Sequence, residues 1–126
     1  EVDDLPTAWN TMFKAWFDVE VPEDRLGCLQ DIHWSMGAFG YFPTYTLGNL
    51  YAAQLLEAMA EDLGDIDDLV ASGNWEPMLT WLRPRIHERG SQVSPAQLIE
   101  DATGSPPSPE PFLRYVERKY GELYQL

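Results

Sequence analysis

The residues best suited to chemistry stand together near the start of this sequence, in the stretch Gln-Asp-Ile-His-Trp. Gln30, Asp31 and His33 provide an amide, a carboxylate and an imidazole within four residues. Bulky Ile32 and Trp34 flank the histidine. Polar groups held beside apolar side chains are typical of the wall of a binding pocket. The alternative is that Asp31 and His33 hydrogen-bond each other inside a packed core, because buried polar groups are usually satisfied locally. Both descriptions can hold at once.

Four aromatic residues follow this cluster and divide by their chemistry. Tyr41 and Tyr45 carry hydroxyl groups that could contact a ligand, whereas Phe39 and Phe42 are expected in the core. A segment that only connects other elements is rarely this apolar, so we expect it to be packed.

The two histidines invite a metal site, and the sequence offers little support for one. His87 lies in Ile-His-Glu-Arg-Gly, which lacks the second histidine of a helical zinc motif, so we expect it to be a cation near a helix C-terminus. A metal site built from Asp31, His33 and acidic neighbours stays open as a third possibility, although we expect no zinc in this chain. Ser35 does not fit the nucleophile elbow of a serine hydrolase.

Composition excludes several classes of partner. The 126 residues are enough for one compact domain, which we expect to span 1–126. The net charge of −13 repels phosphate backbones and anionic lipid, so we expect neither nucleic acid nor a membrane as partner. The single cysteine, Cys28, cannot form an intrachain disulfide, and it favours a cytoplasmic location. Because the first residue is Glu1 rather than Met, we expect the chain to be a piece of a longer polypeptide.

The elements that must position the cluster are predicted to be helices. Apolar residues recur at three- and four-residue spacing, and no alternating stretch is long enough to build a sheet. Residues 27–49 are expected to form a long Gly- and aromatic-rich loop between the first two helices, interrupted at Gly37, Gly40, Pro43 and Gly48. The predicted helices cover about 6–18, 49–64, 65–73, 75–89, 94–104 and 111–126.

Several helix ends carry local signals. Asp65 and Asn74 are predicted N-caps, and Pro84 should kink the helix that contains it. Ser94 is a predicted N-cap, with Gln97 closing a capping box. The last helix is expected to turn one apolar face inward, made of Phe112, Tyr115, Val116 and Tyr120.

The stretch Gly-Cys-Leu-Gln-Asp-Ile-His-Trp, residues 27–34, resembles the G-x-x-Q-D-x-H-W signature of the carboxypeptidase Taq family of zinc metallopeptidases. The block FGYFPTYTLGNLYAAQL is similar to the segment that follows the signature in that family. Looser similarity continues through LGDIDDLVASGNWEPMLTWLRPRIHERG and the terminal YVERKYGELY. The resemblance thus covers nearly the whole chain, as the C-terminal part of a longer protein.

This resemblance implies a bundle-like C-terminal segment of a larger, mostly helical metallopeptidase. Such an enzyme would release single amino acids from peptide C-termini with zinc or another divalent metal. The family's H-E-x-x-H helix, its third ligand and its arginine motif are expected upstream of Glu1. We therefore expect this chain alone to bind no metal, to hold no catalytic residue and to be inactive.

What the resemblance carries over to this chain is one wall of a substrate groove. The residues expected to bind substrate are Gln30, Asp31, His33 and Trp34, with Tyr41 and Tyr45 as weaker candidates. The implied partners are peptide C-termini, the rest of the same polypeptide and a second copy in a homodimer. The competing reading is a non-catalytic helical module that binds a peptide or a protein.

Overall fold

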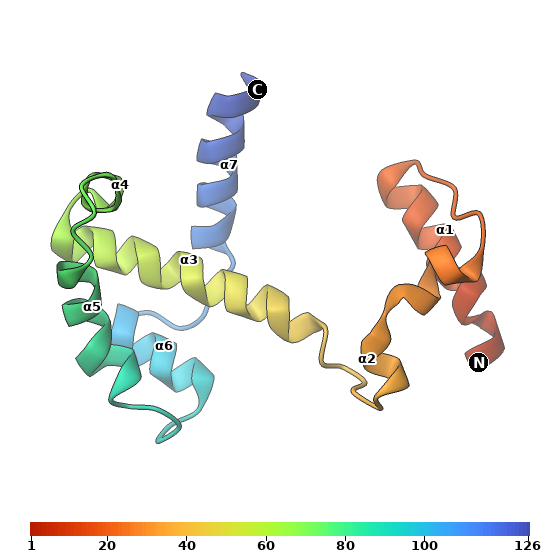
Figure 1. The fold of residues 1–126 in the computed structure, drawn as a ribbon, viewed down its shortest axis with the longest axis horizontal. Coiled ribbons are helices and arrows are strands. Elements are labelled where there is room, and N and C mark those ends of the chain that lie inside the picture. The colour runs from red at the N-terminus through yellow and green to blue at the C-terminus, as the bar shows by residue number, and fades with distance from the viewer. The chain divides into compact units, whose positions relative to one another are not determined.

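The computed structural model describes residues 1–126, contains no strand, and confirms the all-α prediction. Its α-helices are α1 (Leu5–Phe17), α2 (Ile32–Ser35), α3 (Pro43–Leu63), α4 (Ile66–Ala71), α5 (Glu76–Leu82), α6 (Pro95–Thr103) and α7 (Glu110–Tyr124) (Figure 1). None of these helices combines the length and the apolar character that crossing a membrane requires. The chain separates into two compact units, residues 1–43 and 44–126, which are described in turn. That it forms a single domain stays a prediction.

The first unit contains α1, which precedes the Gln-Asp-x-His-Trp cluster in the sequence. The rings of Trp9 and Phe13 stack with centroids 6.3 Å apart along one face of α1. The chain then folds back through two short 3-10 turns, Asp24–Leu26 and Cys28–Gln30. Gly27 between them lies so close to α1 and its C-terminal extension that an added Cβ would stand 2.6 Å from Cγ1 of Val21. The glycine therefore permits the close approach that buries Cys28 next to it.

The irregular stretch after Gln30 is shorter than predicted. The prediction that Pro43 and Gly48 interrupt helical structure is wrong, because α3 begins at Pro43 and continues through Gly48. Proline is compatible with the first position of a helix, where its missing N–H needs no partner. One glycine costs about 1 kcal/mol, which a 21-residue helix tolerates. The true loop covers residues 36–42, and the short helix α2 precedes it.

The core of the second unit lies where α3, α4 and α5 meet. Met59, Ile66 and Trp81 are buried against one another, one from each helix. The indole Nε1 of Trp81 donates to Oδ2 of Asp62 at 2.7 Å. The guanidinium of Arg85 lies 4.5 Å from the centre of the same indole. These contacts give Trp81 a satisfied polar edge within an apolar core.

The helix ends of this unit agree only in part with the local signals. Asp65 caps α4, as predicted, by accepting from the backbone N–H of Asp67 at 2.8 Å. The prediction that Asn74 is an N-cap is wrong, because Trp75 occupies the N-cap position of α5. Around Pro84 the backbone forms a π-helical segment, Arg83–His87, since proline cannot continue the α-helical hydrogen bonding.

Of the two hydrogen bonds in the capping box predicted for α6, one is present and the other is absent. Oγ of Ser94 accepts from the backbone N–H of Gln97 at 3.3 Å, as predicted. The side chain of Gln97 donates to Asp101 at 2.9 Å instead of reaching back to Ser94. This bond, followed by the ion pair with Arg89 at 2.8 Å, lowers the pKa of the Asp101 carboxyl.

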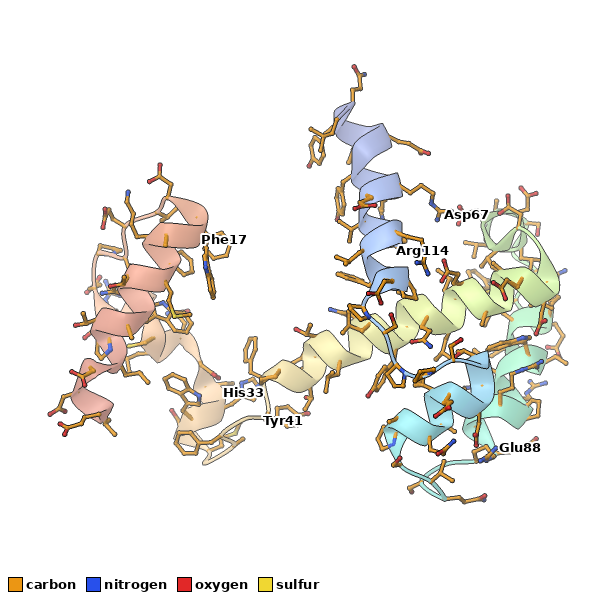
Figure 2. The ribbon with its side chains drawn as sticks, turned by 180° about the vertical axis from the view of Figure 1, so that it is seen from behind. Phe17, His33, Tyr41, Asp67, Glu88 and Arg114 are labelled. Carbon is orange, nitrogen blue, oxygen red and sulfur yellow. The ribbon has the colours of Figure 1, made fainter.

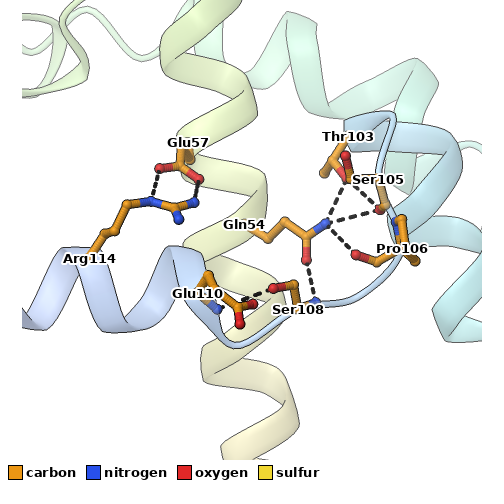
Figure 3. Close-up of polar contacts among 8 residues, drawn as sticks. All are labelled: Gln54, Glu57, Thr103, Ser105, Pro106, Ser108, Glu110 and Arg114. Atoms are coloured by element: carbon orange, nitrogen blue, oxygen red, sulfur yellow. Dashed lines mark hydrogen bonds and ion pairs between the residues drawn. The ribbon is translucent and has the colours of Figure 1, made fainter.

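A buried glutamine on α3 fastens the connector between α6 and α7 (Figure 3). The side chain of Gln54 is 5% exposed. Its Nε2 donates to Oγ1 of Thr103 at 3.0 Å and to the carbonyls of Ser105 at 3.0 Å and Pro106 at 3.2 Å. Its Oε1 accepts from the backbone N–H of Ser108 at 3.1 Å. We call Gln54 and these four partners the connector clamp.

Beyond the connector clamp, α7 extends from α3 on the side away from α5 and α6 (Figure 1). Arg114 forms a two-pronged ion pair with Glu57 of α3, at 2.9 and 2.7 Å. This contact lowers the pKa of the Glu57 carboxyl and raises that of Arg114. The predicted inward face is wrong at Tyr120, whose side chain is exposed.

Candidate functional site

The centre of the candidate site is an aspartate that fixes a histidine two residues later. Asp31 has extended backbone angles and is the N-cap of α2. Its Oδ1 accepts from the backbone N–H of His33 at 2.8 Å and lies 2.7 Å from Nδ1 of the same residue. One carboxylate oxygen therefore starts the helix and orients the imidazole that the helix carries.

This contact decides which nitrogen of His33 carries a proton. An ionised carboxylate can only accept hydrogen bonds, so the Nδ1–H of His33 is the donor to Asp31. Nε2 is then an acceptor in the neutral ring and a donor in the imidazolium. The pair therefore holds the imidazole in one orientation.

Burial of the pair is substantial and incomplete. The side chains of His33 and Asp31 are 16% and 11% exposed. The sequence left open whether the two residues bond each other or face a ligand. The structure confirms the mutual hydrogen bond, and it does not seal the imidazole in an apolar interior.

The loop after α2 turns back onto His33 (Figure 2). The carbonyl of His33 accepts from the N–H of Ala38 at 2.9 Å. Gly37 and Gly40 have φ values of +73° and +75°, in the left-handed region that L side chains rarely adopt. These two turns reverse the chain direction, so that residues 41 and 42 return to the imidazole.

Two rings from this loop lie against the imidazole. The ring of Tyr41 is 5.3 Å from that of His33 and tilted by 35°. The ring of Phe42 is 5.2 Å away and nearly perpendicular, at 89°. Such separations are typical of aromatic contacts.

The prediction that Phe39 and Phe42 are core residues is wrong. Both side chains are exposed, Phe42 by 56%. Phe42 packs edge-to-face with His33, and Phe39 stacks on the indole of Trp34 at 6.4 Å. The loop is held by contacts with the rings of α2, which leave one side of each phenylalanine uncovered.

The other predicted site residues differ in their surroundings. Nε2 of Gln30 donates to the backbone carbonyl of Arg25, so its amide supports the 3-10 turns. Trp34 is half-buried beneath Phe39. Tyr45 is exposed in the first turns of α3 and belongs to the second unit. The structure thus brings Asp31, His33 and Tyr41 together, while the groove roles of all six residues stay predictions.

Phe42 is the contact that the sequence analysis missed. A phenylalanine is assigned to a core by default, because its side chain offers only apolar surface. Its position beside Tyr41 and before Pro43 was the available signal, since a residue before proline is held in an extended conformation.

The residues of this site do not fit a metal ion. No group of three or more His, Cys, Asp or Glu side chains lies close enough together to hold one. Asp31 and His33 direct their facing atoms at each other, which leaves that side of both residues closed to a metal. A metal site built on this pair therefore finds no support in the geometry.

Comparison with known proteins assigns this chain to a family. A family model described as carboxypeptidase Taq (M32) metallopeptidase matches residues 1–120. Thermostable carboxypeptidase 1 of Thermus thermophilus is 47% identical over 122 residues, which are 97% of this chain and 24% of the relative. Carboxypeptidase 1 of Bacillus subtilis is 41% identical over 125 residues, which are 99% of this chain and 25% of the relative.

A solved structure of an M32 carboxypeptidase also matches this chain. The M32 carboxypeptidase from Deinococcus radiodurans matches with a TM-score of 0.93 and 35% identity, over 99% of this chain and 25% of that one. The chain spans about a quarter of the length of the curated relatives, corresponding to their C-terminal part. This chain belongs to the carboxypeptidase Taq (M32) family of metallopeptidases.

Proposed function

We propose that this chain forms one wall of the peptide-holding groove of a metal-dependent carboxypeptidase, which releases single amino acids from peptide C-termini. The observation that carries the proposal is the 2.7 Å contact between Asp31 and Nδ1 of His33, at a site that is not fully closed to solvent. An imidazole held in one orientation is suited to recognise a substrate oxygen.

The roles of the residues follow from their atoms. Asp31 orients His33, whose Nε2 donates to a carboxylate or carbonyl oxygen of the peptide when the ring is protonated. Tyr41 is proposed as a weaker substrate contact in the same region, because its ring lies 5.3 Å from the imidazole. Such donors stabilise the negative charge that develops on the scissile carbonyl.

The metal is supplied by groups outside these 126 residues, and zinc is the metal that we propose. The family is one of metallopeptidases, and the described side chains do not form a metal site. We therefore expect residues 1–126 alone to be inactive toward peptides.

Exposed apolar faces support association with the rest of the polypeptide and with a second copy. α1 exposes Met12, Trp16 and Phe17, and α7 exposes Leu113, Tyr120, Leu123 and Tyr124. Clusters of exposed apolar side chains are often covered by a partner surface. Light scattering of the isolated chain should give a mass above 14.4 kDa, and a clean monomer at high concentration would count against this inference. The buried, unpaired Cys28 supports a cytoplasmic location.

The decisive experiment replaces His33 in the full-length enzyme. His33→Ala should lower kcat/KM for peptides by about 100-fold or more, as loss of a transition-state donor does, and should leave the metal content unchanged. Asp31→Asn should give a smaller loss, because the ring remains but its orientation is no longer fixed by a charge. His87→Ala is the matched control, since His87 is exposed at the end of the π-helical segment.

Unchanged kinetics in His33→Ala would refute the groove role. Peptide binding without turnover by the full-length protein, with its metal content confirmed, would favour the non-catalytic binding module.

A further inference from the structure

The side of α7 that faces its own unit carries charge. Pro111 is buried, and together with Arg114, Tyr115 and Arg118 it lines one groove with residues of α3 and α4. These four positions follow the three- and four-residue spacing of one helix face. Arg114 fastens this face to α3 through its ion pair with Glu57. The side of α7 toward α3 and α4 therefore includes two arginines.

The apolar side of α7 points the other way. Each residue turns an α-helix by about 100°, so the side chain of Tyr120 leaves the helix roughly opposite to that of Arg118. Seven and eleven residues are close to two and three full turns, so Leu113, Tyr120 and Tyr124 share one side, with Leu123 beside them. All four side chains are exposed. We call these four residues the outer face of α7.

This orientation is the reverse of the usual one. A helix with one apolar side normally buries that side against its own domain. No other helix of the second unit covers the outer face, since its side chains are exposed. Contiguous exposed apolar patches often mark protein interaction sites. The outer face is therefore the side of α7 from which a partner surface is missing.

Two observations favour the preceding polypeptide over a second copy as that partner. This chain spans about a quarter of the curated relatives and corresponds to their C-terminal part, so most of such a protein precedes it. Glu117 is the only charged residue on the same side of α7 as the outer face. A two-fold interface places the same surface opposite itself, so it would bring this carboxylate, in segments of net charge −13, toward its own copy.

We propose that the outer face of α7 packs on the part of the full-length polypeptide that precedes Glu1. The proposal rests on the association with the rest of the polypeptide that forms part of the proposed function, and it does not depend on the groove role of His33. The two sides of α7 then have different tasks. The charged side attaches the helix to α3, and the apolar side joins this segment to the preceding one.

The test uses the full-length enzyme and follows hydrogen exchange of residues 113–124 by mass spectrometry. Tyr120→Ala should make these amides exchange at least about tenfold faster, because it removes a ring from a packed interface. Alanine favours a helix more than tyrosine does, so on an uncovered face the same change would slow exchange or leave it unchanged. Glu122→Ala is the matched control, because Glu122 is exposed and lies about 200° around the helix from Tyr120. It should leave exchange unchanged or slower.

Two further readouts of Tyr120→Ala identify what covers the face. Exchange should also become faster in a peptide that precedes Glu1, and sedimentation should give the wild-type mass at every protein concentration. A fall in mass would show that a second copy covers the face. Faster exchange in residues 1–43 alone, besides α7, would show that the first unit covers it. Either result, or unchanged or slower exchange in α7, would overturn the proposal.

The outcome can be separated from that of the groove role. If His33→Ala has no kinetic effect but Tyr120→Ala speeds exchange as expected, the groove role fails and the docking of α7 stands. If His33→Ala lowers kcat/KM but Tyr120→Ala does not speed exchange, the docking fails and the groove role stands.

Discussion

Replacing Gln54 should loosen the attachment of α7 more than any exposed polar substitution. The buried amide contacts four groups of residues 103–108, which connect α6 to α7. We take Gln54→Leu as the perturbation, because leucine fills a similar volume and removes every hydrogen bond that the Gln54 side chain makes in the connector clamp.

The magnitude follows from which groups lose their partner. Nε2 has only two protons, so its three acceptors receive about two full hydrogen bonds, and the bond from Ser108 N–H is the third. At about 0.5–1.5 kcal/mol each, the sum is about 1.5–4.5 kcal/mol. Oγ1 of Thr103 keeps its bond to the Ile99 carbonyl at 2.8 Å, which reduces the loss. We therefore expect Gln54→Leu to lower the free energy of unfolding by about 2–3 kcal/mol.

Two measurements check this expectation. Urea unfolding, monitored by circular dichroism, gives the global loss of stability. Native-state hydrogen exchange at the Ser108 amide gives the local loss, and it should become at least about tenfold faster. Gln97→Leu is the control, because the Gln97 amide is exposed on α6 and makes a single bond to Asp101, so its loss should stay within about 0.5 kcal/mol.

The reasoning would be refuted by equal effects of Gln54→Leu and Gln97→Leu on unfolding. An unchanged exchange rate at Ser108 would also contradict it, because that amide donates directly to Gln54.

Three further predictions concern the cap of α4, the ion pair between Glu57 and Arg114, and the close approach of Gly27 to Val21. Asp65→Ala should lower the free energy of unfolding by about 1 kcal/mol in urea titrations, since the carboxylate caps α4, and Asp65→Asn should lose much less. Arg114 lowers the pKa of Glu57 below its ordinary 4.5, so the pair's stabilisation is fully present above pH 4.5 and is lost as the pH falls through the lower, folded value. The stability difference between the wild type and Arg114→Gln should accordingly shrink in unfolding curves below pH 4.5, and a constant difference would contradict the pairing. Gly27→Ala should destabilise the first unit, because the new methyl group would stand 2.6 Å from Val21, and an unchanged melting temperature would show that Val21 moves aside freely.

Local chemistry predicted the helix ends that depend on one or two neighbouring residues. Asp65 and Ser94 act as caps because the groups that they bond lie two or three residues away. The sequence predicts the start of α3 six residues too late, because Pro43 and Gly48 resemble interruptions of a helix. Whether a glycine stays helical depends on the whole length of the helix, which no short window contains.

In the candidate site, too, the sequence predicted the contact between near neighbours and missed the contacts that depend on more distant residues. The contact between Asp31 and His33 was among the two alternatives that the sequence allowed, because it spans two residues. The contact of Phe42 with His33 depends on a chain reversal at Gly37 and Gly40, whose φ signs the sequence does not specify. Gln54 was overlooked because its partners lie 49–54 residues further along the chain.

The continuity of α3 links the connector clamp to the direction in which Tyr45 points. Tyr45 and Gln54 are nine residues apart on one unbroken helix, and each residue turns the helix by about 100°. Nine residues make about two and a half turns, so the two side chains leave the helix axis on opposite sides. Holding the Gln54 amide inward therefore keeps the Tyr45 phenol outward, about 13.5 Å away along the axis toward the start of α3. Any rotation of α3 that released Gln54 from Ser108 would turn Tyr45 through the same angle.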